Sequence, residues 1–173
     1  LAAASFSERV SSLTSIMSSS GNTTLPAPTP AAATALFAPL PRQRDRESIV
    51  ADSITRYETL ESPAYPTDRG RLRQLFADEY ERNFDPRGVA RQLAALIANG
   101  DRRSLLQTIT APSVVLHGAA DQLIPLACGE DVARNIPNAE LRIIDGMGHD
   151  FPVALSQVIG DAICAAAHRA GQR

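Results

Sequence analysis

Two polar side chains follow neighbouring predicted strands and could work together as a catalytic pair. Asp121 lies in a loop after the buried-type run 113–117, and His149 lies in the loop 146–150 after the alternating run 139–145. Because parallel strands joined by a helix end at the same edge of a sheet, we expect the two loops to meet. A carboxylate bonded to one imidazole nitrogen fixes the tautomer and leaves the other nitrogen free to take a proton. The pattern predicts that His149 is a general base oriented by Asp121.

Other acidic and imidazole side chains compete for these two roles. Asp145 ends the predicted strand and Asp150 directly follows the proposed base, so neither is expected to face its ring. His117 stands at a strand end, where we expect partial burial, and His168 is expected to be a solvated residue at a helix end. A single Asp after a strand is commonly a turn or capping residue, so the argument depends on the pair and not on either residue alone.

The ends of the chain supply the strands and helices that would position these loops. Residues 112–173 alternate strand, helix, strand and helix, with one helix predicted at 125–136 and another carrying an apolar face over 155–166. Residues 1–20 predict the end of a helix and then a strand within 10–17. Strands separated by helices of this length favour a parallel sheet.

The middle of the chain predicts helices only. Residues 18–44 begin with a Ser- and Gly-rich loop, continue with spaced prolines, and contain a short Ala-rich helix around 31–37. Between 45 and 107, apolar residues recur at three- and four-residue spacing and predict three helices. Gly100 follows the last of them, as a C-terminal cap would.

Composition narrows the class of protein. The chain has 173 residues, of which 44% are hydrophobic and 21% charged, with a formal net charge of −2. These values fit one globular domain and argue against nucleic acid or an anionic membrane as partner. Cys128 and Cys164 form no CxxC pair or Cys/His cluster, so we expect no metal site. No apolar run reaches membrane-spanning length and no signal-peptide pattern is present, so we predict a cytoplasmic protein that needs no cofactor.

Two of these motifs resemble a known family. The run HG-x-x-D-x-x-I-P at 117–125 and G-M-G-H at 146–149 resemble the C-terminal part of the α/β-hydrolase fold family. Within that family the chain looks most similar to bacterial hydrolases of the aclacinomycin methylesterase type. The resemblance implies that Asp121 is the acid and His149 the base of a catalytic triad.

The resemblance also implies a division of the chain. The fold class would be α/β, the C-terminal part of an α/β-hydrolase parallel sheet with an inserted all-helical cap. Residues 1–25 and 105–173 would form an incomplete hydrolase core, and residues 26–104 would form the cap.

The family's nucleophile motif is absent from this sequence. That motif, G-x-S-x-G, precedes the acid and the base in chain order. The run Ser18–Gly21 lacks the leading glycine and is not expected to replace it. We therefore expect the nucleophile to lie before Leu1 or on a partner chain, and the isolated chain to be inactive.

Three functions remain open from the sequence. The first is a serine-type hydrolase that cleaves a carboxylic ester or related acyl bond of a small molecule, with Phe76, Tyr80 and Phe84 lining an apolar pocket. The same aromatic residues could instead only pack helix on helix. The second keeps the Asp–His pair for epoxide hydrolysis, dehalogenation or haloperoxidase chemistry, and the missing nucleophile would decide. The third is a non-catalytic binding module.

Overall fold

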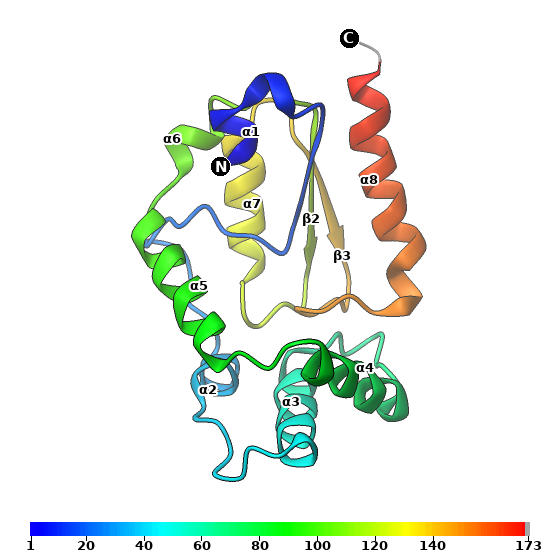
Figure 1. Ribbon diagram of the computed structural model, residues 1–173. Coiled ribbons are helices and arrows are strands. Elements are labelled where there is room, and N and C mark those ends of the chain that lie inside the picture. The colour runs from blue at the N-terminus through cyan, green and yellow to red at the C-terminus, as the bar shows by residue number, and fades with distance from the viewer. Residues whose placement is uncertain (172–173) are drawn as a thin grey trace.

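A three-stranded parallel sheet carries the loops predicted to form the site. The computed structural model describes residues 1–171 (Figure 1). The strands are β1 (Leu13–Ile16), β2 (Ser113–Gly118) and β3 (Glu140–Ile144), in the spatial order β1-β2-β3. Both pairings are parallel, so all three strands end at the same edge of the sheet.

Helices cover both faces of the sheet. α7 (Leu126–Asn135) packs on one face and α8 (Ser156–Ala170) on the other (Figure 1). Side chains alternate along β2, so Val114 and Leu116 pack in the cluster that includes α8, while Val115 packs with residues of α7. Every residue of β2 is buried, which explains why its central residues, Val114, Val115 and Leu116, are all apolar and do not alternate with polar residues.

Short helices complete this α/β part. They are α1 (Ala2–Ser5), the 3₁₀ turn η1 (Ser7–Arg9), α6 (Arg103–Leu106) and the 3₁₀ turn η2 (Val153–Leu155). The strand predicted within 10–17 is shorter than expected. The turn η1 ends just before it, and Met17, whose φ is 48°, ends the extended backbone.

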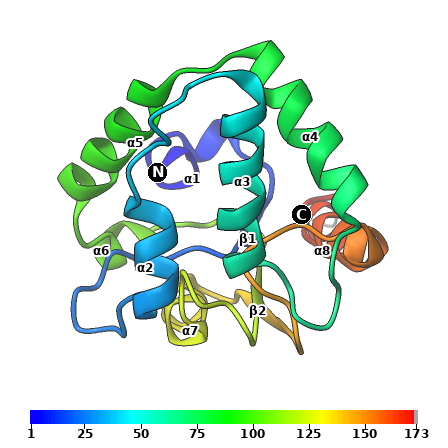
Figure 2. The same ribbon diagram turned by 90° about the horizontal axis from the view of Figure 1, so that it is seen from below.

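Four helices form a separate layer beyond the carboxyl ends of the strands, here called the helical layer (residues 30–99). They are α2 (Pro30–Phe37), α3 (Arg46–Leu60), α4 (Arg69–Arg82) and α5 (Pro86–Asn99). In Figure 1 the strand arrows point toward α3 and α4, and Figure 2 looks onto the layer from below. The three helices predicted between 45 and 107 and the Ala-rich helix are therefore confirmed, while α6 was not predicted.

Local sequence explains where the helices of this layer begin. The side chains of Thr29, Asp45, Asp68 and Asp85 each accept a hydrogen bond from a backbone N–H of the first turn. α2 and α5 also have proline at their first position, where no N–H is needed. Gly100, with φ 56°, follows α5 as predicted.

The chain enters and leaves the helical layer at one place. Arg102 donates a backbone hydrogen bond to Ser20 O (2.8 Å), and its Nη2 donates to Ser19 O (2.7 Å). Gly21, with φ 81°, lies so close to the carbonyl of Gly100 that no Cβ could fit there. The two segments of backbone that connect the helical layer to the rest of the chain thus lie side by side. Within residues 1–171, no helix combines the length and hydrophobicity that crossing a membrane requires.

Candidate active site

The loops after β2 and β3 are joined by their backbones before any side chain is considered. Ala119 N donates to Ile144 O (2.9 Å), and Ala120 N donates to Met147 O (3.0 Å). Gly118 lies against the carbonyl of Met147 so closely that a side chain would clash. The first loop therefore holds Asp121 at a fixed position beside the loop that carries His149.

Asp121 and His149 form a hydrogen bond. The Oδ2 atom of Asp121 lies 2.8 Å from Nδ1 of His149. The other oxygen, Oδ1, accepts the backbone N–H groups of Leu123 (2.9 Å) and Ile124 (2.8 Å). The Asp121 side chain is fully buried, whereas 25% of the His149 side chain is exposed. The carboxylate is thus fixed by its own loop and faces a ring that solvent can reach.

This geometry determines how the imidazole is protonated when neutral. A carboxylate only accepts hydrogen bonds, so Nδ1 of His149 must carry the proton. Nε2 is then the nitrogen with the free lone pair, and it forms no hydrogen bond with any residue from 1 to 171. The arrangement can accept a proton at Nε2 and stabilise the resulting imidazolium through Asp121.

The other residues that competed for these roles form no hydrogen bond with His149, although Nε2 of His117 lies 3.7 Å from Oδ2 of Asp121. His117 is fully buried rather than partly buried, because its ring packs on Gly129 beneath the sheet edge and bonds to Ile124 O at 2.7 Å. Asp145 is exposed at the end of β3, and His168 is exposed in the last turn of α8. None of the three is within hydrogen-bonding distance of the His149 ring.

Asp150 forms a buried cluster of its own with residues of the helical layer. Its Oδ1 accepts hydrogen bonds from the N and Oγ atoms of Ser62, and its Oδ2 accepts one from the hydroxyl of Tyr57 (2.8 Å). Burial, together with the Asp150 carboxylate, raises the pKa of Tyr57 to about 12. Sequence reasoning missed Ser62 and Tyr57, because nothing local in their sequence marks them as partners of a residue 88 and 93 positions away, respectively.

The serines that follow β1 form other hydrogen bonds, and the cysteine on α7 is not activated. Ser18 Oγ donates to Ile16 O, Ser19 Oγ accepts the N–H of Gly21, and the buried Ser20 Oγ donates to Asp131. Burial raises the pKa of the Cys128 thiol, which disfavours a reactive thiolate. Among residues 1–171, no serine or cysteine is hydrogen-bonded to His149.

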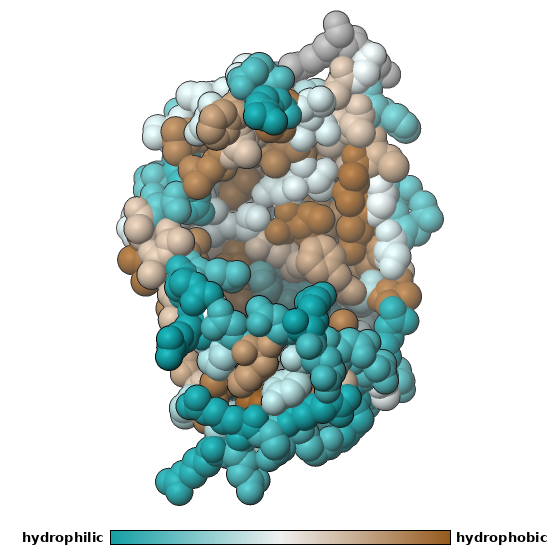
Figure 3. Space-filling view, in the orientation of Figure 1, coloured by the Kyte–Doolittle hydropathy of each residue, from teal (hydrophilic) through white to brown (hydrophobic). Residues whose placement is uncertain are grey.

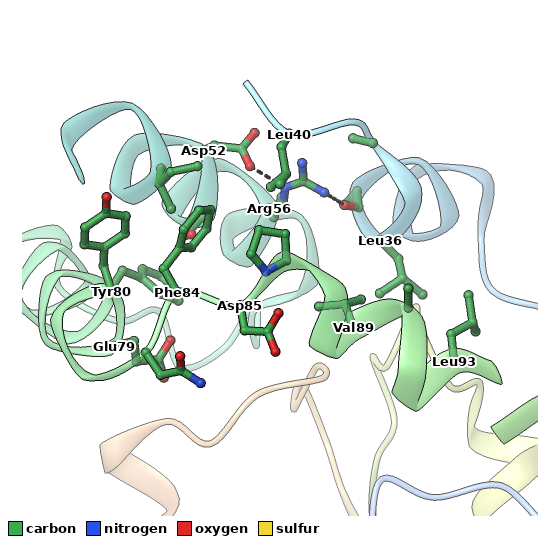
Figure 4. Close-up of a pocket in the computed structure, with 18 of the residues that line it drawn as sticks. Leu36, Leu40, Asp52, Arg56, Glu79, Tyr80, Phe84, Asp85, Val89 and Leu93 are labelled. Atoms are coloured by element: carbon green, nitrogen blue, oxygen red, sulfur yellow. Dashed lines mark hydrogen bonds and ion pairs between the residues drawn. The ribbon is translucent and has the colours of Figure 1, made fainter. Parts of the chain in front are cut away.

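A pocket of about 590 Å³ lies within the helical layer (Figure 4). Phe76, Tyr80 and Phe84, the three aromatic residues singled out in the sequence, all line it. Tyr80 and Phe84 stack with their ring centroids 5.1 Å apart, on the opposite side of the view from Leu36 and Leu93. Residues of α2, α3, α4 and α5 all contribute to the mostly apolar wall.

One residue, Leu60, connects the pocket with the Asp–His pair. Neither Asp121 nor His149 lines the pocket, but Leu60 does, and its carbonyl accepts the backbone N–H of His149 at 2.8 Å. Within the described part of the chain, no group of His, Cys, Asp and Glu side chains is arranged to hold a metal ion.

Comparison with known proteins finds partial matches to several curated proteins, two of which are methyl ester esterases. No family model matches the chain. It is 41% identical over 54 residues to a pimeloyl-[acyl-carrier protein] methyl ester esterase of Aromatoleum aromaticum, covering 31% of this chain and 22% of that protein. It is 26% identical over 127 residues to the rhodomycin D methylesterase DnrP of Streptomyces peucetius, covering 72% of this chain and 42% of that protein. The chain therefore spans less than half the length of these relatives.

A solved structure shares the arrangement over nearly the whole chain. The meta-cleavage product hydrolase CumD of Pseudomonas fluorescens superposes with a TM-score of 0.68 at 16% identity, covering 97% of this chain and 59% of that one. At this identity the likeness concerns the fold.

Proposed function

The chain has the α/β-hydrolase fold, as its motifs predicted, and on that premise we propose that it supplies the acid and the base of an ester-cleaving enzyme. His149 is the general base and Asp121 orients it. The hydrogen bond of 2.8 Å between Asp121 Oδ2 and His149 Nδ1 carries this proposal, because it leaves Nε2 unprotonated and accessible.

The proposed reaction is acyl transfer through a serine that lies outside residues 1–173. His149 Nε2 takes the proton of the serine hydroxyl as its oxygen attacks the ester carbonyl, and then returns that proton to the departing alcohol. Water repeats the sequence to release the acid. Asp121 stays a carboxylate throughout and stabilises the imidazolium. The absence of a G-x-S-x-G motif from residues 1–173, and matches that cover less than half of each relative's length, support a nucleophile elsewhere.

We further propose that the helical layer is the enzyme's cap and that its pocket binds the apolar part of the ester. Its apolar lining and its volume of about 590 Å³ suit a hydrophobic acyl or alcohol group. Phe76, Tyr80 and Phe84 would contact that group. The position of Leu60, between the pocket and the backbone of His149, supports a bound ester that extends toward the base. Because two relatives are methyl ester esterases, methyl esters of apolar acids are the first substrates to test.

Labelling with a fluorophosphonate, which modifies activated serines, tests this proposal. In the complete protein, we expect a labelled serine outside residues 1–173, and loss of both labelling and methyl ester hydrolysis in His149→Ala. His168→Ala is the matched control, since that histidine is exposed in the last turn of α8 and forms no hydrogen bond with Asp121 or His149. A labelled serine within residues 1–173 would contradict the proposal that the nucleophile lies outside this segment. Unchanged hydrolysis in His149→Ala would sink the proposed function itself.

A further inference from the structure

One buried carboxylate next to the proposed base has no role in the reaction described above. Asp150 is 5% exposed and accepts three hydrogen bonds, two from Ser62 and one from Tyr57. All three donors belong to α3 or to the residues that follow it. Burying a carboxylate costs free energy of desolvation, which hydrogen bonds must offset. The three hydrogen bonds to Asp150 therefore have to be made together in the folded protein.

Ser62 makes the cluster continuous with the backbone of the base. Its Oγ donates to Asp150 and at the same time accepts the N–H of Gly148 (2.9 Å), the residue before His149. Ser62 is fully buried, so water does not compete for either bond. The residues on both sides of His149 are therefore bonded to the same serine.

The surrounding backbone repeats this connection. His149 N donates to Leu60 O (2.8 Å), and Ala64 N donates to Gly146 O (3.2 Å). A Cβ on Gly148 would lie 2.6 Å from the carbonyl oxygens of both Leu60 and Glu61. The loop 146–150 thus lies directly against the segment 60–64, and the imidazole ring extends from it to Asp121.

We propose that Asp150 is a positioning residue, which fixes the backbone of His149 against the end of α3 so that the ring meets Asp121 and the substrate in one orientation. This inference rests on the proposed function of His149. Asp121 determines the tautomer of the His149 ring, and Asp150 determines the position of the His149 backbone from which the ring extends. It also follows that the proposed cap and the base move together, because the same cluster joins them.

Substitutions at Asp150 and Ser62 separate positioning from simple stability. In the complete protein carrying Asp150→Ala, we expect kcat for p-nitrophenyl butyrate to fall about 10- to 100-fold per folded molecule, with KM little changed, because a misplaced base slows the chemical step. Asp150→Asn keeps an oxygen for Ser62 and is expected to recover most of that loss. Ser62→Ala removes the acceptor of the Gly148 N–H and is expected to behave like Asp150→Ala.

Asp131 provides the matched control. It is also a buried aspartate, 7% exposed, and accepts a serine hydroxyl, that of Ser20 at 2.5 Å, but it has no bond to the loop of His149. Asp131→Ala is expected to lower the melting temperature while leaving kcat per folded molecule unchanged. If Asp150→Ala lowers only the melting temperature in the same way, Asp150 is merely structural and the inference is overturned.

A spectroscopic readout keeps the inference independent of activity. The downfield NMR resonance of the His149 Nδ1 proton reports its hydrogen bond to Asp121. We expect this resonance to shift or broaden in Asp150→Ala and Ser62→Ala, and to stay in place in Asp131→Ala. An unmoved resonance in both variants overturns the inference. Should Asp150→Ala not fold, Ser62→Ala carries the test, with Asp150→Asn as the variant expected to keep the resonance in place. A failure of the proposed hydrolysis would appear separately as full activity in His149→Ala.

Discussion

The two carboxylate oxygens of Asp121 have different partners, and this decides what an asparagine would do in the same place. Oδ1 is held by the N–H groups of Leu123 and Ile124, so the oxygen of an asparagine would take that position. Its NH₂ group would then face Nδ1 of His149 and donate to it. The proton of the neutral ring would move to Nε2, and the base would lose its free lone pair.

We therefore expect Asp121→Asn to lower kcat for ester hydrolysis by about 10³- to 10⁴-fold, with little change in melting temperature. Asp145→Asn is the control, because that carboxylate is exposed at the end of β3 and should leave kcat unchanged. Steady-state kinetics of the two purified variants decide the matter. A fall of less than tenfold for Asp121→Asn would show that the tautomer of His149 is set by something else.

Tyr57 is expected to make the folding stability of the protein depend on pH in the alkaline range. Its pKa is raised from 10.0 to about 12, so between these values the folded protein keeps a proton that the unfolded chain has lost. Folding stability contributed by this group is complete below pH 10 and is lost as the pH rises toward 12. We expect Tyr57→Phe to flatten the decline in unfolding free energy over this range, measured by urea denaturation. If the unfolding free energy falls equally steeply with pH in both proteins, the ionisation of Tyr57 is not the cause of the decline.

The sequence indicated the Asp–His pair but not the cluster beside it, for a physical reason. Parallel strands end at one edge of a sheet, so residues that follow neighbouring strands meet whatever the rest of the fold does. Asp150 meets Ser62 only because the helical layer folds back over that edge, across 88 residues of chain. No local pattern encodes such a contact. The burial of His117 was underestimated for the same reason, because Gly129, which accommodates the ring, lies on the following helix.

At the scale of elements, the contact between the loop 146–150 and the end of α3 requires glycine. A methyl group on Gly148 would lie 2.6 Å from two carbonyl oxygens, both of backbone that cannot rotate away. The loop would have to move, and His149 would move with it. The capping residues that start α2, α3, α4 and α5 are visible in the sequence, but the fit between a loop and a helix end is not, since it depends on the final packing of both.

Gly148→Ala is accordingly expected to destabilise the fold by about 1–3 kcal/mol and to lower kcat. Gly160→Ala is the matched control, because Gly160 lies within α8 with open space around its Cα. Alanine there is expected to stabilise the protein by about 0.5–1 kcal/mol and to leave kcat unchanged. Thermal unfolding and ester hydrolysis are measured on both variants. A Gly148→Ala protein as active as Gly160→Ala would show that the loop tolerates displacement.

At the scale of the whole molecule, several apolar surfaces remain uncovered within residues 1–171. α5 buries none of its residues, and Val89, Leu96 and Ile97 on it are 61%, 56% and 71% exposed. β1 pairs only with β2 among the described strands, so its other edge offers free backbone groups. Figure 3 shows apolar side chains along the upper part of the molecule, above a mostly hydrophilic helical layer. Surfaces of this kind are commonly covered by another strand, another domain or another chain.

We therefore expect the 173-residue chain by itself to associate with its own copies as its concentration rises. Sedimentation velocity should show a weight-average mass that increases with concentration. Ile97→Glu, which places a charge on the exposed face of α5, should reduce that increase. Gln92→Glu adds the same charge to an exposed polar position of the same helix and should leave it nearly unchanged. An open sheet edge beside an exposed apolar helix face favours association between copies of the chain. A chain that stays monomeric at all concentrations and unfolds cooperatively would contradict this expectation and show that these surfaces are stable in water.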